Sequence, residues 1–234
     1  DDVDLSKNAK LQLDVYKSKK DLIDKKAIIE FLSDLNYPIY FMDFETFQPA
    51  VPMFDNSKPY MQIPFQYSLH YKKSKKSKIE HFDFLAETGI DPRIKFIENL
   101  LRDTKKEGDI LTYNKSFEVL RLKEIADVFP KYKKEIEEQI SRVKDLMIPF
   151  QKKYFYTSKM QGSYSIKYVL LLLFSELSYK DLGINEGGLA SIAFESLYYE
   201  TDLMRIADTR TNLLEYCKLD TYAMVKLLEK LESL

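Results

Sequence analysis

The stretch Ile39-Tyr40-Phe41-Met42-Asp43-Phe44-Glu45-Thr46-Phe47 places two acids inside the most apolar run of the chain. Its length and its aromatic and branched residues predict a β-strand. Because successive side chains of a strand point to opposite faces, Asp43 and Glu45 share one face, and Met42 and Phe44 share the other. Burying unpaired carboxylates is costly, and a divalent cation would relieve that cost for both acids. The alternative is that this end of the strand is solvated or paired with lysine.

The segments around this run predict one α/β domain. Further strands are expected at 65–71, 79–85, 109–113 and 143–150. Helices are expected from Pro92, from a cap at Ser116, over 131–142, over 166–174 after Ser165, and over 211–231. This order predicts a five-stranded mixed sheet flanked by helices, with three antiparallel strands followed by parallel ones.

The N-terminal part of the chain is predicted to lie outside the sheet domain. Residues 1–35 are polar and predicted to be helical, so we expect an N-terminal helical extension or linker, followed by a domain over 36–234. The chain begins with Asp1-Asp2 rather than Met, which we interpret as a sign that it is a piece of a longer protein.

Composition narrows the chemistry. The chain has 234 residues with 36 basic and 37 acidic side chains, so no strong overall attraction to nucleic acid is indicated. One cysteine excludes an internal disulfide and a thiolate zinc cage, which suits a cytoplasmic protein. Two histidines leave little for a histidine zinc site or a Ser-His-Asp enzyme. No apolar run approaches the ~20 residues of a membrane span.

The lysine-rich run from Lys72 to Lys78 is the densest basic segment. It is read either as a solvated hairpin tip or as a loop that contacts phosphate, in which case binding would depend on salt.

Two further groups of residues add carboxylates. Glu118 follows Asn114 in the first turn of a predicted helix, where the helix dipole alone would favour an acid. Tyr216 and Asp220 share a helix face, which is also common for surface pairs. Together with Asp43 and Glu45, they supply the carboxylates from different elements that two-metal phosphoryl transfer requires. Oxygen ligands favour Mg²⁺ or Mn²⁺, and we expect two ions.

These three groups resemble the exonuclease motifs of the DnaQ-like DEDD superfamily, tyrosine subclass. The resemblance rests on Asp43-x-Glu45, Asn114-x-x-Phe117-Glu118 and Tyr216-x-x-x-Asp220, and it implies a ribonuclease H-like fold. The segments Gly162–Lys167 and Tyr216–Thr221 resemble, more closely, an uncharacterised bacterial domain family that often lies C-terminal to a RecB-like nuclease segment.

The resemblance implies a role for each matching residue. Asp43 would bridge the two ions, and Glu118 stands where the superfamily usually has aspartate. Tyr216 would orient the attacking water, because a phenol with a pKa near ~10 is a poor base. The implied catalytic residues are Asp43, Glu45, Glu118, Tyr216 and Asp220, of which the four acids are the metal ligands, and the implied substrate-binding residues are Phe44, Asn114 and Lys167.

The implied activity is metal-dependent 3′–5′ exonuclease hydrolysis of single-stranded DNA or RNA. Expected partners are a single strand or its 3′ end and an upstream nuclease domain of the same full-length chain, with no membrane. Two alternatives stay open: a nucleic-acid-binding module that has lost efficient catalysis, and a structural domain of a larger nuclease.

Overall fold

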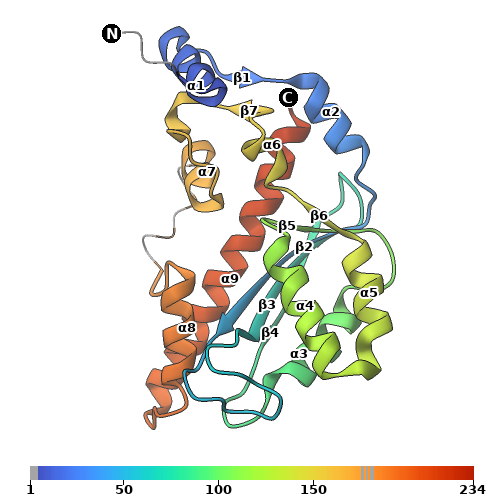
Figure 1. Ribbon diagram of the computed structural model, residues 1–234, viewed down its shortest axis with the longest axis vertical. Coiled ribbons are helices and arrows are strands. Elements are labelled where there is room, and N and C mark those ends of the chain that lie inside the picture. Colours follow the sequence, from blue (N-terminus) through green and yellow to red (C-terminus); the bar gives the residue numbers. More distant parts are fainter. Residues whose placement is uncertain (1–4, 175–176, 178, 180–181) are drawn as a thin grey trace.

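A five-stranded mixed sheet runs through the centre of the computed structural model, which describes residues 5–174, 177, 179 and 182–234 (Figure 1). The strand order is β4-β3-β2-β5-β6. Pairs β2–β3 and β3–β4 are antiparallel, whereas β2–β5 and β5–β6 are parallel. This confirms the predicted mixed sheet. The strands are β2 (Ile39–Phe47), β3 (Ile63–Lys72), β4 (Ile79–Leu85), β5 (Asp109–Thr112) and β6 (Val143–Asp145).

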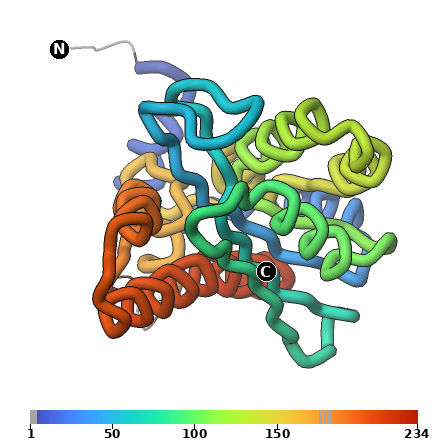
Figure 2. The backbone as a smooth tube through the Cα atoms, turned by 90° about the horizontal axis from the view of Figure 1, so that it is seen from below, coloured from blue at the N-terminus to red at the C-terminus, as the bar shows by residue number. Residues whose placement is uncertain are grey.

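Helices cover both faces of the sheet (Figure 2). On one face, α3 (Pro92–Asp103), α4 (Ser116–Val128) and α5 (Lys133–Ser141) pack on the apolar side chains of β2 that include Met42 and Phe44. On the other face, Phe41 and Phe47 contact the layer made by α7 (Ile166–Leu173), α8 (Gly187–Ser196) and α9 (Leu203–Glu232). The α9 layer is therefore the one that meets Asp43 and Glu45, because these acids alternate with Met42 and Phe44 along β2.

The register between β2 and β3 decides which polar residues share this layer. Asp43 lies opposite Ser68, and Phe41 lies opposite His70. Directly opposed residues of antiparallel strands point to the same face. The face below α9 therefore carries acids toward the end of β2 and hydroxyl and imidazole groups on β3.

Residues 5–35 pack onto the rest of the chain. They form α1 (Lys7–Ser18), β1 (Leu22–Ile23) and α2 (Lys25–Ser33), and β1 pairs with β7 (Phe155–Tyr156). The expectation of helix throughout this part is wrong at β1, where pairing with a distant strand overrides local helical preference. Val15 and Ile28 join the same apolar cluster as the end of α9. The boundary placed at residue 35 stays a prediction, and residues 1–4 lie outside the described part.

The fifth strand is shorter than predicted. It ends at Asp145, and Ile148–Gln151 form α6 with Pro149 in the first turn. The Asp145 carboxylate accepts the backbone N–H groups of Asn114, Lys115 and Met147, which turns the chain out of the sheet. Ser116 is the first residue of α4 rather than its cap. Two single turns complete the elements, η1 (Pro130–Tyr132) and η2 (Ser158–Met160).

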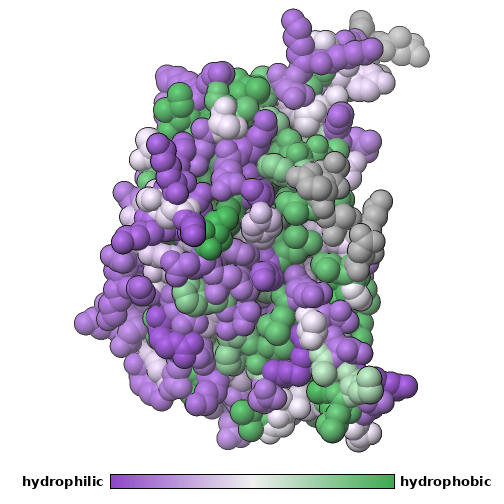
Figure 3. Space-filling view, turned by 180° about the vertical axis from the view of Figure 1, so that it is seen from behind, coloured by the Kyte–Doolittle hydropathy of each residue, from purple (hydrophilic) through white to green (hydrophobic). Residues whose placement is uncertain are grey.

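Exposed apolar side chains gather at one corner of the molecule. Figure 3 shows hydrophobic surface at the lower corner, where Figure 1 places α8 and the start of α9. Within the described residues, no helix combines the length and the apolarity needed to cross a membrane. The large exposed apolar residues of this corner are Leu189, Ile192, Tyr199, Leu203 and Met204.

Candidate active site

Two acids of the site come from β2. Strand alternation points Asp43 and Glu45 toward the α9 layer. Glu45 is only 7% exposed, and Asp43 keeps partial exposure. A side chain placed at Gly187, the first residue of α8, would lie 3.7 Å from Glu45 Oε2, so the N-terminus of α8 lies against this carboxylate. The positive end of a helix dipole favours an acid there.

The other two acids come from helices on either side of the sheet. Glu118 lies in the first turn of α4, directly after β5, and Asp220 lies in the middle of α9. Both side chains are buried. Among the described residues, Glu118 Oε2 has no hydrogen-bond partner. Asp43, Glu45, Glu118 and Asp220 are called the carboxylate cluster from here on.

Burial raises the pKa of every member of the carboxylate cluster, and repulsion from a neighbouring acid adds to this shift for Asp43, Glu45 and Glu118. Burial raises the pKa of Asp43, and the charge of Asp220 raises it further. Burial followed by the charge of Asp43 raises the pKa of both Glu45 and Glu118. Burial raises the pKa of Asp220 to about 6, although hydrogen bonds and Lys167 oppose the shift. Asp43 thus interacts electrostatically with each of the other three acids, and their charged forms are costly without a cation.

Cys217 is a member of the site that the sequence reading missed. Its Sγ lies 3.8 Å from Asp43 Oδ2, and ligand atoms of Asp43, Glu45 and Cys217 all lie within 4.8 Å of one another. Cys217 precedes Asp220 by three residues, so both side chains lie on one side of α9. This helical spacing is the sequence signal that could have identified Cys217. Burial, with the neighbouring acids, raises the pKa of the thiol. A protonated thiol leaves the oxygen atoms as the donors for a hard cation.

Lys167 is the cation that enters this acidic region. Its Nζ donates to the Tyr216 hydroxyl at 2.9 Å and to the Asn185 carbonyl at 2.7 Å. Burial and then the charge of Asp220 raise the pKa of Tyr216, so this phenol stays protonated. The predicted residues Lys167 and Tyr216 are therefore in contact with each other beside the carboxylate cluster.

Tyr179 is a second tyrosine of the site, and no motif pointed to it. Its hydroxyl donates to Asp220 Oδ1 at 2.6 Å, and the side chain is buried. It comes from the segment between α7 and α8, which lacks the spacing signal that identified Tyr216.

The structure does not bring Phe44 to the site. Its ring packs on Phe96 at a centroid distance of 4.9 Å, inside the core on the opposite face of the sheet. The same alternation that groups Asp43 with Glu45 turns Phe44 away, so the expectation that it touches substrate does not fit its position. Asn114 is exposed at the junction of β5 and α4, with φ 75° and its backbone amide bonded to Asp145.

A second buried polar group lies on the same face of the sheet and contains no acid. Ser68 Oγ lies 2.9 Å from His81 Nε2 and 2.7 Å from Thr221 Oγ1, and His70 Nδ1 lies 2.8 Å from Thr221 Oγ1. We call Ser68, His70, His81 and Thr221 the hydroxyl–histidine cluster. Burial lowers the pKa of His70 to about 3, so its ring is neutral. Hydrogen bonds thus link all four members, and His81 Nδ1 also lies 3.6 Å from Asp83 Oδ2.

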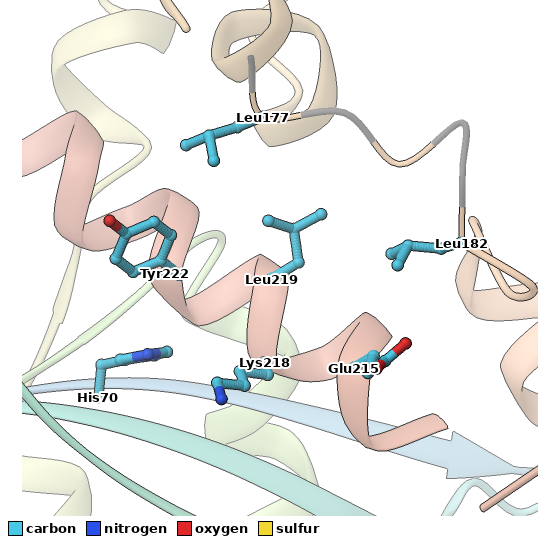
Figure 4. Close-up of a pocket in the computed structure, with 7 residues that line it drawn as sticks. All are labelled: His70, Leu177, Leu182, Glu215, Lys218, Leu219 and Tyr222. Carbon is cyan, nitrogen blue, oxygen red and sulfur yellow. The ribbon is translucent and has the colours of Figure 1, made fainter. Parts of the chain in front are cut away.

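A cavity of about 540 Å³ opens beside His70 (Figure 4). The α9 residues that line it are Glu215, Lys218, Leu219 and Tyr222. This cavity shares no residue with the carboxylate cluster, within the described part of the chain. Its lining is His70, Leu177, Leu182, Glu215, Lys218, Leu219 and Tyr222.

Comparison with known proteins gives relatives but no solved structure. The chain is 28% identical to "Uncharacterized protein UU173" of Ureaplasma parvum over 90% of its length, and 28% identical to "Uncharacterized protein MG366 homolog" of Mycoplasma pneumoniae over 80%. It spans 33% and 31% of these relatives, about a third of each. No solved structure matches. A family model matches residues 40–165, more than half of the chain, and the chain therefore belongs to the family described as Domain of unknown function (DUF2779).

Proposed function

We propose that this domain is a divalent-metal-dependent phosphodiesterase that acts as a 3′–5′ exonuclease on single-stranded DNA or RNA. One observation carries the proposal: Asp43 and Glu45 bring carboxylate oxygens within 4.8 Å of each other at the end of β2, with the buried acids Asp220 of α9 and Glu118 of α4 close enough to interact electrostatically with Asp43. The resemblance to the DEDD superfamily, tyrosine subclass, supplies the reaction class and the polarity. The relatives are about three times as long as the matched region, and further domains of a longer chain would accompany this domain.

The donor set fits Mg²⁺ or Mn²⁺. These ions prefer oxygen ligands, and the candidates to hold two of them are Asp43, Glu45, Glu118 and Asp220. The unpartnered Oε2 of Glu118, noted among the described residues, is an oxygen that such an ion would satisfy. Bound ions would polarise the phosphate and activate water for an in-line displacement. The side chain of Glu118 is longer than the aspartate that the superfamily has at this position, so we expect Glu118 to bind an ion less tightly than the other three ligands.

The protein's own groups take complementary roles. The Tyr216 hydroxyl, held protonated by burial and by neighbouring charge, orients the attacking water rather than removing its proton. Lys167 brings a positive charge beside the acids, where an anionic phosphate would enter. Asn114, exposed at the start of α4, is placed to contact the strand.

The test is digestion of 5′-labelled single-stranded DNA and RNA with Mn²⁺, with Mg²⁺, and with chelator. We expect stepwise shortening from the 3′ end only with metal. The Asp43→Asn variant should lose at least about a thousandfold in rate, which corresponds to about 4 kcal/mol of transition-state stabilisation. The matched control is Asp83→Asn, which removes an exposed acid opposite Ser68 and should keep full activity.

Other outcomes separate the alternatives. Metal-independent cleavage, or equal rates in wild type and Asp43→Asn, would sink the enzyme proposal. Oligonucleotide binding without product would favour the module that has lost catalysis. Neither binding nor cleavage would favour a structural domain of a larger protein.

A further inference from the structure

We propose that Tyr179 is a positioning residue of this site, which fixes the Asp220 carboxylate and the Lys167 ammonium group relative to each other. The proposal rests on the proposed metal site and adds a residue from outside the three sequence motifs. In this proposal the hydroxyl of Tyr179 orients the proposed metal ligand Asp220, and the ring of Tyr179 contacts Lys167.

The contacts of Tyr179 are short and specific. Its hydroxyl donates to Asp220 Oδ1 at 2.6 Å, a length typical of a hydrogen bond to a charged acceptor. The Lys167 Nζ lies 5.1 Å from the centroid of the Tyr179 ring. Both Tyr179 and Asp220 are buried, at 5% and 6% exposure, so water does not compete strongly for these contacts.

Tyr216 also contacts Lys167. The Lys167 Nζ lies 4.7 Å from the Tyr216 ring centroid and donates to its hydroxyl, while the two tyrosine rings meet edge to face at 6.2 Å. A flexible lysine would otherwise sample many positions. Contacts with both rings, together with the hydrogen bonds to the Tyr216 hydroxyl and the Asn185 carbonyl, restrict the ammonium group to the neighbourhood of the carboxylate cluster.

Both tyrosines therefore act on Asp220. Tyr179 donates to Oδ1 and orients this carboxylate, as partners of metal ligands commonly do. Tyr216 accepts from Lys167, and its hydroxyl also lies close enough to Asp220 to lower the pKa of that acid. Removing the hydroxyl of Tyr179 frees Asp220 to rotate, which should weaken metal binding and activity together.

The decisive experiment compares Tyr179→Phe with wild type by Mn²⁺ titration, followed by electron paramagnetic resonance, and by cleavage rate at saturating oligonucleotide. We expect Mn²⁺ affinity to fall about 10- to 100-fold. We expect kcat at limiting Mn²⁺ to fall similarly and KM for the oligonucleotide to change less than threefold. At saturating Mn²⁺ the rate should recover in part, which a residue acting directly on the phosphate would not permit.

Tyr40→Phe is the matched control, because Tyr40 is buried in the core on the other face of the sheet and its hydroxyl has no partner among the described residues. It should bind Mn²⁺ as wild type does. Unchanged Mn²⁺ affinity in a folded Tyr179→Phe variant would overturn the proposal, even if the enzyme is active. If wild type binds Mn²⁺ but cleaves nothing, the proposed function fails while the positioning role is still measured by the titration. If wild type binds no Mn²⁺, both fail.

Discussion

Two neighbouring polar clusters lie where β2 and β3 meet α9, and they differ in one respect. The hydroxyl–histidine cluster pairs its members with one another: Thr221 Oγ1 lies within 2.8 Å of both Ser68 Oγ and His70 Nδ1. In the carboxylate cluster, repulsion raises the pKa of neighbouring acids, and Glu118 Oε2 is without a partner in the described part of the chain. The two clusters lie next to each other, since Asp43 is opposite Ser68 and Asp220 precedes Thr221.

The two clusters therefore have different effects on the stability of the fold. A buried polar network whose members are satisfied stabilises one arrangement of the core. A group of buried like charges lowers stability, and it is retained where a bound cation or a reaction uses it. The first cluster can thus be understood from the fold alone, whereas the second is what the proposed metal site would explain.

Opposite effects of mutation on stability are the sharpest test of this comparison. In the presence of chelator, Thr221→Val should lower the free energy of unfolding by about 1–3 kcal/mol, because it strips the shared partner from Ser68 and His70. Glu118→Gln should raise it by about 1–3 kcal/mol, because it removes a buried charge beside Asp43. Urea unfolding followed by circular dichroism measures both.

Excess Mn²⁺ provides the control for this pair of variants. It should stabilise wild type by about 2.7 kcal/mol at a concentration 100 times the Kd, and it should do the same for Thr221→Val. If Glu118→Gln and Thr221→Val destabilise the protein equally, the carboxylate cluster is an ordinary part of the core.

Acid should break the hydroxyl–histidine cluster through His70. The pKa of His70 is lowered to about 3 in the folded protein, below the ~6.5 of an unfolded chain. Between these values the unfolded chain binds a proton that the folded protein does not, so the contribution is present above pH ~6.5 and is lost as pH falls. It amounts to about 2 kcal/mol between pH 6.5 and pH 5.

Comparison of wild type with His70→Gln isolates this effect from the acids, whose raised pKa values change stability in the other direction. Between pH 6.5 and pH 5, we expect the free energy of unfolding to fall by about 2 kcal/mol less in His70→Gln than in wild type. His81→Gln is the control, because nearby Asp83 opposes the lowering of the His81 pKa. Parallel stability curves for wild type and His70→Gln would contradict the prediction.

The sheet could be predicted from the sequence because its signals are local. The strands at Ile39–Phe47 and Ile79–Leu85 end where the run of strand-forming residues stops and turn or loop residues begin. The two-residue strand β1 could not be predicted, since it exists only through pairing with Phe155–Tyr156. The role of Asp145 could not be predicted for a related reason: its carboxylate accepts the backbone N–H groups of Asn114 and Lys115, 31 and 30 residues away in the sequence.

Parts of the candidate site were accessible in the same way. Asp43 and Glu45 stand out because they interrupt an apolar strand, and Asp220 follows Tyr216 at helical spacing. Tyr179 carries no such signal, because its place in the site depends on a hydrogen bond to Asp220, 41 residues further along the chain. The resemblance implied a substrate contact for Phe44, although strand alternation puts its side chain on the other face.

The smallest effect is expected at the lysine-rich tip between β3 and β4, which Figure 2 shows projecting from the molecule. Lys72 is part of β3, is buried and pairs with Glu229 at 3.0 Å. It lies opposite Ile39, the first residue of β2, whereas the carboxylates lie toward the other end of that strand. The exposed lysines of the tip therefore face away from the proposed reaction, which favours the reading as a solvated turn.

Replacing Lys73, Lys76 and Lys78 by serine together should change oligonucleotide affinity less than twofold. Fluorescence anisotropy between 50 and 200 mM salt measures it, with Lys167→Met as a comparison that should weaken binding at the site itself. If the tip contacts three phosphates, the slope of log affinity against log salt should instead become shallower by about 2. That outcome would place the strand across the far end of the sheet, so that a surface remote from the carboxylate cluster would hold the substrate.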